Sequence, residues 1–106
     1  MKFKIAGREI GNNKDPLIIA EIGINHNGNL DQAIAIADSA IKSGAEILKH
    51  QTHIPDEEMS LEAKRAIPGN SKKSIYSIIK YCTLSETDEE KLKKYIKLKK
   101  KIFIST

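Results

Sequence analysis

The sequence predicts an α/β protein in which about three parallel strands alternate with helices, preceded by a small β-hairpin. Three observations indicate this: a continuous apolar run over residues 17–24, an apolar stripe with helical spacing over 30–43, and a second strand-like segment over 46–52. A strand, a helix and a strand within about 35 residues form a βαβ unit, and its right-handed crossover makes the two strands parallel.

The first residues predict the hairpin. Residues 2–5 and 8–10 alternate between apolar and polar side chains, and Ala6-Gly7 between them suits a tight two-residue turn. A polar link over residues 11–16 leads into the apolar run 17–24. Because such runs are typical of strands that are covered on both faces of a parallel sheet, we expect burial on both faces here.

The first predicted helix has a clear start and end. Asn29 is a preferred N-cap residue before the helix 30–43, and Gly44 provides a C-terminal stop. The segment 53–73 that follows the second strand is polar, with one or two helical turns expected around residues 59–66. A loop of this length inside a compact domain is usually functional.

Two further helices and a third strand are expected in the last third of the chain. Residues 74–82 have amphipathic spacing, and Ser85 with Asp88 predicts a capping box for a helix over 86–99. The strand is expected over residues 101–106. The inward-facing residues of the last helix are predicted to be Leu92, Ile96 and the stem of Lys99.

Three parallel strands with intervening helices suit either the start of a (β/α)8 barrel or half of a doubly wound sheet. A barrel needs about 250 residues, whereas this chain has 106 and stops on a strand with no helix after it. We therefore expect an N-terminal fragment, with a hairpin and link over residues 1–15 and the first three β/α units over 16–106.

Composition excludes several classes of protein. Apolar residues make up 40% of the chain, and six Gly with three Pro are too few for a collagen-like or low-complexity sequence. No apolar stretch is long enough to span a bilayer, and no apolar h-region follows the charged residues of the segment 1–4. A single cysteine, Cys82, agrees with a reducing compartment. We expect a cytoplasmic protein with no membrane partner.

The net charge of +4 comes from the second half of the chain. Residues 1–53 have six basic and six acidic side chains, residues 54–106 have twelve and eight, and seven lysines lie between Lys91 and Lys101. Acidic residues at the start of a helix and lysines at its end complement the helix dipole. We therefore favour a solvated helix face and expect no nucleic-acid partner, with a module that binds anions or nucleic acid through this segment as the alternative.

Polar side chains stand at the predicted strand ends, where parallel α/β folds bind their ligands. Glu21 lies within the first apolar strand, and Lys49 lies on the next strand. The ammonium of Lys49 could pair with Glu21 for structure alone, or with a substrate phosphate or carboxylate. Both interpretations agree with the sequence.

The three histidines do not predict a metal site. Residues three apart in a strand point to opposite faces, so His50 and His53 are poorly placed to hold one ion. The chain also has no GxGxxG or GxxxxGK[ST] loop, so nothing favours nucleotide binding.

Several separated motifs, in the same order, resemble the N-acetylneuraminate (sialic acid) synthases, from about residue 16 to the end. They are EIGINHNG at 21–28, KHQTHI at 49–54, DEEMS at 56–60, IPGN at 67–70 and FIST at 103–106.

The resemblance implies a (β/α)8 barrel that condenses phosphoenolpyruvate with N-acetylmannosamine to give N-acetylneuraminate and phosphate. A small antifreeze-like C-terminal domain follows it in the family and reaches the partner subunit's site in a homodimer. The family uses Mn²⁺ or Mg²⁺, and its metal-binding histidines and main catalytic carboxylate lie further along the chain. We therefore expect no metal ligand or catalytic residue in these 106 residues, the C-terminal domain to be absent from them, and the chain alone to be inactive.

The resemblance also implies roles for individual residues. Glu21 is similar to a carboxylate that binds the sugar hydroxyls, and Gln51 and Asn70 are similar to other sugar contacts. Lys49 and Thr106 are similar to phosphoenolpyruvate contacts. A synthase of a related nonulosonic acid, legionaminic or pseudaminic acid, is the near alternative. A third interpretation has this chain assembling with other chains to complete a sheet, through the open edge of the last strand.

Overall fold

The computed structural model describes residues 1–106, and its elements follow the predicted order. A hairpin of β1 (Lys2–Ile5) and β2 (Arg8–Gly11) precedes a sheet of β3 (Ile19–Gly23), β4 (Ile47–His50) and β5 (Ile102–Ser105). The helices are α1 (Leu30–Lys42), α2 (Pro55–Glu58), α3 (Ile75–Cys82) and α4 (Glu86–Leu98), with a 3₁₀ turn η1 (Ala63–Arg65).

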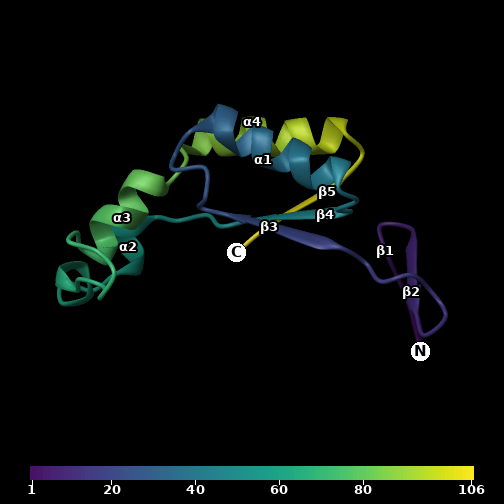
Figure 1. The fold of residues 1–106 in the computed structure, drawn as a ribbon, viewed down its shortest axis with the longest axis horizontal. Coiled ribbons are helices and arrows are strands. Elements are labelled where there is room, and N and C mark those ends of the chain that lie inside the picture. Colours follow the sequence, from purple (N-terminus) through teal and green to yellow (C-terminus); the bar gives the residue numbers. More distant parts are fainter.

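The sheet has the order β3-β4-β5, and both pairs of strands are parallel. Helices α1 and α4 lie side by side on one face of this sheet (Figure 1). The hairpin lies at one end of the molecule, and α2 and α3 form a lobe at the other end (Figure 1). The predicted α/β fold class, with a hairpin before a three-stranded parallel sheet, is therefore confirmed.

The hairpin turn follows from its two central residues. Ala6 and Gly7 have φ values of 45° and 85°, as a type I′ turn requires. Arg8 then joins the hairpin to the sheet, because its Nε donates to Glu46 Oε2 at 2.9 Å, just before β4. This hydrogen bond lowers the pKa of the Glu46 carboxyl.

The core lies between the sheet and the two helices that cover it. It is formed by Ile22, Ala33, Ala37, Ala45, Leu48, Leu84, Leu92 and Ile96. The expected burial of the first strand on both faces is wrong, because the helices cover only one face. Ile19 is 48% exposed on the open face of β3, whereas Ile22 is buried on the face toward the helices, and Ile18, just before the strand, is 47% exposed. The radius of gyration is 16.4 Å, against about 13 Å for a compact domain of this length, so the chain is elongated.

The helix caps are those that the sequence predicts. Asn29 accepts a hydrogen bond from the Gln32 amide at 2.9 Å, and Ser85 accepts one from the Asp88 amide at 3.2 Å. The inward placement of Lys99 is wrong: its side chain is exposed, with the ammonium 5.3 Å from the Tyr95 ring centroid.

The long segment after β4 differs from the prediction in one respect. The turn η1 lies within the predicted range 59–66, whereas α2 lies before this range. Pro55 occupies the first turn of α2, where its missing N–H costs nothing and its fixed φ suits the helix.

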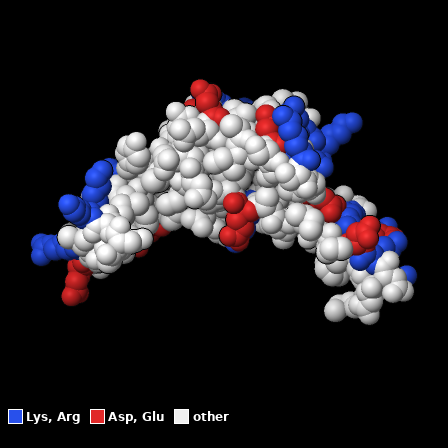
Figure 2. All heavy atoms as spheres, in the orientation of Figure 1, with Lys and Arg blue, Asp and Glu red and all other residues white.

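The lysine-rich end of α4 is an ordinary solvated helix surface. Lys91 and Lys93 form ion pairs with Asp88 and Glu90, at 3.3 Å and 3.8 Å. Figure 2 shows basic side chains in several separate places, with acidic side chains beside them, rather than in one continuous patch. No helix is both long and apolar enough to cross a bilayer.

Candidate functional site

Glu21 and Lys49 lie side by side near the carboxyl ends of β3 and β4. They are partners in the register of the two strands, and Lys49 Nζ is 3.1 Å from Glu21 Oε1. The side chain of Glu21 is 67% exposed, and that of Lys49 is 31% exposed. Exposed ion pairs contribute only about 0–1 kcal/mol to folding stability, so this pair is not needed to stabilise the fold. Both charges are accessible to a ligand.

Strand alternation places Gln51 and Thr106 on the same face as Lys49. Gln51 is two residues beyond Lys49, and Thr106 is two residues beyond Ile104, the register partner of Lys49. The backbone of Thr106 continues the ladder, donating to His50 O at 3.2 Å and accepting from the Thr52 amide at 2.9 Å. An acid, an amine, an amide and a hydroxyl thus share the open face at one end of the sheet.

Asn70 lies apart from these four residues. It is in the loop between η1 and α3, and α3 belongs to the lobe at the end of the molecule (Figure 1). Its side chain is exposed, and no hydrogen bond joins it to Glu21, Lys49, Gln51 or Thr106. The structure therefore brings together four of the five predicted site residues and leaves the fifth on the neighbouring lobe.

His53 contacts Gln51 and the short helix α2. Its Nε2 is 3.3 Å from Gln51 Oε1, and its Nδ1 is 2.9 Å and 3.1 Å from the two oxygens of Glu58. Glu58 is the last residue of α2. Both imidazole nitrogens are thus held by side chains, and the helix that follows Pro55 supplies one of them.

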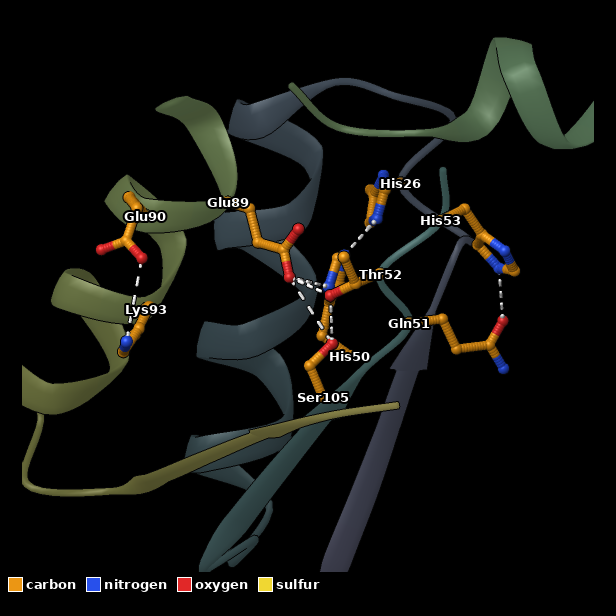
Figure 3. A network of polar contacts seen from close by, with 9 residues as sticks. All are labelled: His26, His50, Gln51, Thr52, His53, Glu89, Glu90, Lys93 and Ser105. Carbon is orange, nitrogen blue, oxygen red and sulfur yellow. Dashed lines mark hydrogen bonds and ion pairs between the residues drawn. The ribbon is translucent and has the colours of Figure 1, made fainter. Parts of the chain in front are cut away.

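A buried pair of histidines lies on the other face of the sheet, toward the helices. His26 and His50 are 0% and 1% exposed, and their Nε2 atoms are 3.1 Å apart. The Gly28 amide donates to His26 Nδ1 at 3.1 Å, and His50 Nδ1 is 3.3 Å from Glu89 Oε1 (Figure 3). The loop after β3, the end of β4 and helix α4 meet at this chain of contacts.

These contacts determine the tautomers. Since the Gly28 amide donates to His26 Nδ1, the proton of the neutral His26 ring is on Nε2 and is donated to His50 Nε2. The proton of His50 is then on Nδ1 and faces Glu89, although its alignment does not make a hydrogen bond. Two neutral rings satisfy the geometry, whereas a second proton between the Nε2 atoms would place two donors face to face.

Glu89 connects the strand ends on this side of the sheet. Thr52 donates a hydrogen bond to its Oε1, and the hydroxyls of Thr52 and Ser105 are 2.6 Å apart. Ser105 also lies 3.5 Å from the same carboxylate oxygen (Figure 3). Helix α4 thereby holds the ends of β4 and β5 together.

Burial lowers the pKa of both His26 and His50 below the ordinary value of 6.5. The neighbouring His50 also lowers the pKa of His26, while the carboxylate of Glu89 opposes the shift at His50. Both imidazoles resist protonation in the folded state but take up protons freely in the unfolded chain. The free energy of unfolding therefore depends on pH.

Stability is expected to fall as the pH is lowered through about 6.5, because the unfolded chain then binds more protons than the folded one. The slope approaches about 1.4 kcal/mol per pH unit for each imidazole. Urea unfolding of the complete polypeptide measures this slope. The pH values should run from about 7.5 to about 5.5, so that they lie on both sides of the ordinary His pKa. His50→Gln should flatten the dependence, and a variant with an unchanged slope would contradict this explanation.

The sequence pointed to the three histidines but not to their partners. The His26–His50 contact joins residues on two elements, and Glu89 comes from a third. The strand alternation that argued against one ion held by His50 and His53 agrees with the structure, in which these residues have separate partners.

The residues present do not form a metal centre. Nowhere do three or more His, Cys, Asp or Glu side chains converge to hold an ion, and the accessible carboxylate of Glu21 already faces an ammonium. The expectation that Mn²⁺ or Mg²⁺ is held by residues outside this chain stays a prediction.

Comparison with known proteins shows the family of this chain. Residues 36–106 match the model of the NeuB family. The chain is 34% identical over 105 residues to the spore coat polysaccharide biosynthesis protein SpsE of Bacillus subtilis, covering 98% of this chain and 28% of SpsE. It is 40% identical over 65 residues to the N,N'-diacetyllegionaminic acid synthase of Campylobacter jejuni, covering 61% of this chain and 17% of that enzyme.

A solved structure has the same fold. The N-acetylneuraminic acid (sialic acid) synthetase of Leptospira borgpetersenii, in complex with citrate, matches 99% of this chain and 33% of its own, with a TM-score of 0.75 and 25% identity. The chain thus spans about a third or less of the length of these relatives. With a family model that matches most of its length and relatives that are synthases of sialic acid-type sugars, the chain belongs to the NeuB family.

Proposed function

We propose that this chain is the N-terminal part of a (β/α)8 barrel that condenses phosphoenolpyruvate with an N-acetylated amino sugar, N-acetylmannosamine being the first candidate. The observation that supports it is the accessible Glu21–Lys49 pair, 3.1 Å apart at the carboxyl ends of parallel strands in a NeuB family chain. This is where barrel enzymes bind their substrates.

The chemistry of the pair suits two substrates of different charge. Lys49 is a compact cation that can pair with a phosphate or carboxylate of phosphoenolpyruvate, and Thr106 adds a hydroxyl donor on the same face. Glu21 can accept hydrogen bonds from sugar hydroxyls. Because the exposed ion pair contributes little stability, exchanging one partner for a substrate costs little.

In the proposed reaction, C3 of phosphoenolpyruvate attacks the aldehyde carbon of the open-chain sugar and forms a carbon–carbon bond. Water adds at C2, and the bond between C2 and the phosphate oxygen breaks to release inorganic phosphate. This chain would bind and orient the two substrates by preorganised charge and hydrogen bonds. The main catalytic carboxylate, a divalent metal site, the homodimer contact and a C-terminal domain would come from outside residues 1–106, and the cytoplasmic location stays a prediction.

A synthase of legionaminic or pseudaminic acid is the second candidate, because relatives with those names match this chain. The two candidates share phosphoenolpyruvate and differ in the amino sugar. The alternative in which Lys91–Lys101 binds nucleic acid is not favoured by the comparisons.

The test is an assay of the complete polypeptide with phosphoenolpyruvate and a panel of N-acetylated amino sugars. We expect phosphate release that depends on the sugar, with a nonulosonic acid detected by mass spectrometry. Glu21→Gln should raise the KM for the sugar by about tenfold, since a charge-assisted hydrogen bond is lost, while Glu62→Gln, at an exposed glutamate, should behave as the wild type. Absence of sugar-dependent phosphate release would contradict the proposed function.

A further inference from the structure

The amide of Gln51 is held from one side by a histidine that has no role in the site described so far. His53 Nε2 lies 3.3 Å from Gln51 Oε1, and the two side chains lie together, apart from the Glu89 group (Figure 3). The His53 side chain is 18% exposed, so it is a partly enclosed group rather than a solvated one.

The orientation of the imidazole is set by α2. A carboxylate only accepts hydrogen bonds, so the two contacts of Glu58 with His53 Nδ1, at 2.9 Å and 3.1 Å, place a proton on Nδ1. The ring cannot rotate by half a turn without exchanging this charge-assisted hydrogen bond for the weaker one to the amide. Glu58 therefore fixes which nitrogen faces Gln51.

A fixed nitrogen orders the glutamine amide. Nε2 of His53 lies 3.3 Å from Oε1 at one end of the amide and holds that end in place. The opposite end of the amide is left for a ligand. An unsupported glutamine would sample both orientations and would lose that freedom on binding.

We propose that His53, anchored by Glu58, is a positioning residue that orients the Gln51 amide toward the polar groups of the amino sugar. This inference rests on the proposed function and on the similarity of Gln51 to a sugar contact in the sialic acid synthases. It adds that the short helix α2 at the start of the long segment takes part in sugar binding through His53. It further predicts that the effect is confined to the sugar, because no hydrogen bond or ion pair joins His53 to Lys49 or Thr106.

The test compares variants of the complete polypeptide in steady-state assays with both substrates. His53→Ala is expected to raise the KM for the amino sugar by about three- to tenfold, the equivalent of one neutral hydrogen bond, while kcat and the KM for phosphoenolpyruvate change by less than about twofold. His53→Gln, whose amide can take the place of Nε2, should restore most of the loss. Glu57→Ala is the matched control, since the Glu57 side chain is exposed and forms no ion pair.

A double-mutant cycle separates this inference from the proposed function. In a Gln51→Ala background, His53→Ala should cause no further rise in the KM for the sugar. If Gln51→Ala raises that KM and His53→Ala does not, or if the two effects multiply independently, the positioning role of His53 is wrong. If Gln51→Ala itself has no effect, the sugar contact at Gln51 is wrong and the inference falls with it.

If His53→Ala does not fold, a variant of Glu58, the residue that holds His53, still tests the proposal. Glu58→Ala leaves the imidazole in place but frees it to rotate, and it should raise the KM for the sugar in the same direction by a smaller factor. Circular dichroism of each variant checks folding. An unchanged KM for the sugar in a folded Glu58→Ala variant would overturn the anchoring role of α2.

Discussion

Lys49→Met is expected to raise the KM for phosphoenolpyruvate by about 10- to 100-fold, because hydrogen bonds to charged groups contribute about 1.5–3 kcal/mol. Methionine keeps the length of the stem and removes the ammonium, which lies 3.1 Å from Glu21 on the accessible face. The KM for the amino sugar should change less, since Glu21 and Gln51 remain. Initial rates with each substrate varied in turn, in the complete polypeptide, measure both values.

The matched control is Lys72→Met, at an exposed lysine in the lobe that forms no ion pair. Its kinetics should equal those of the wild type. Unchanged phosphoenolpyruvate affinity in Lys49→Met would show that the cation serves the Glu21 pair alone, and the assignment of Lys49 to the substrate would be wrong.

Gly28→Ala is expected to lower the free energy of unfolding by about 2–4 kcal/mol, from the strain of a left-handed L-residue and from overpacking. Gly28 has a φ of +72°, and a Cβ there would lie 2.5 Å from the carbonyl oxygen of Tyr81 and 3.2 Å from that of Thr83. Both neighbours are backbone atoms, that of Tyr81 in the last turn of α3 and that of Thr83 just after this helix, so they cannot move aside cheaply. Urea unfolding of the complete polypeptide measures the loss.

Gly44→Ala provides the comparison, because Gly44 has a φ of +102° with open space around its Cβ position. It isolates the cost of the backbone conformation, about 1–2 kcal/mol. If both variants lose the same free energy of unfolding, the contact between the loop after β3 and the end of α3 adds nothing to the cost of Gly28→Ala.

The elements that local patterns determine could be predicted from the sequence. The βαβ order follows from apolar runs and helical spacing, and Asn29 and Ser85 cap their helices because their side chains can accept the free amides nearby. Strand alternation likewise brings Lys49 and Thr106 to one face once the strands are known to be parallel.

Features that depend on a second layer or on distant contacts could not be predicted. An apolar strand indicates burial but does not show which layer supplies it, so the exposure of Ile18 and Ile19 was missed. The His26–His50–Glu89 contacts join three elements, and no local pattern signals them. Pro55 followed by three acidic residues was the available signal for α2.

A crystal structure of the complete polypeptide with phosphoenolpyruvate bound tests most directly whether the strand ends form one substrate site. We expect the ligand's phosphate or carboxylate oxygens within about 3 Å of Lys49 Nζ, with Thr106 on the same side of the ligand. Phosphoenolpyruvate bound away from the β3–β4–β5 rim, with the Glu21–Lys49 pair intact and untouched, would contradict the account.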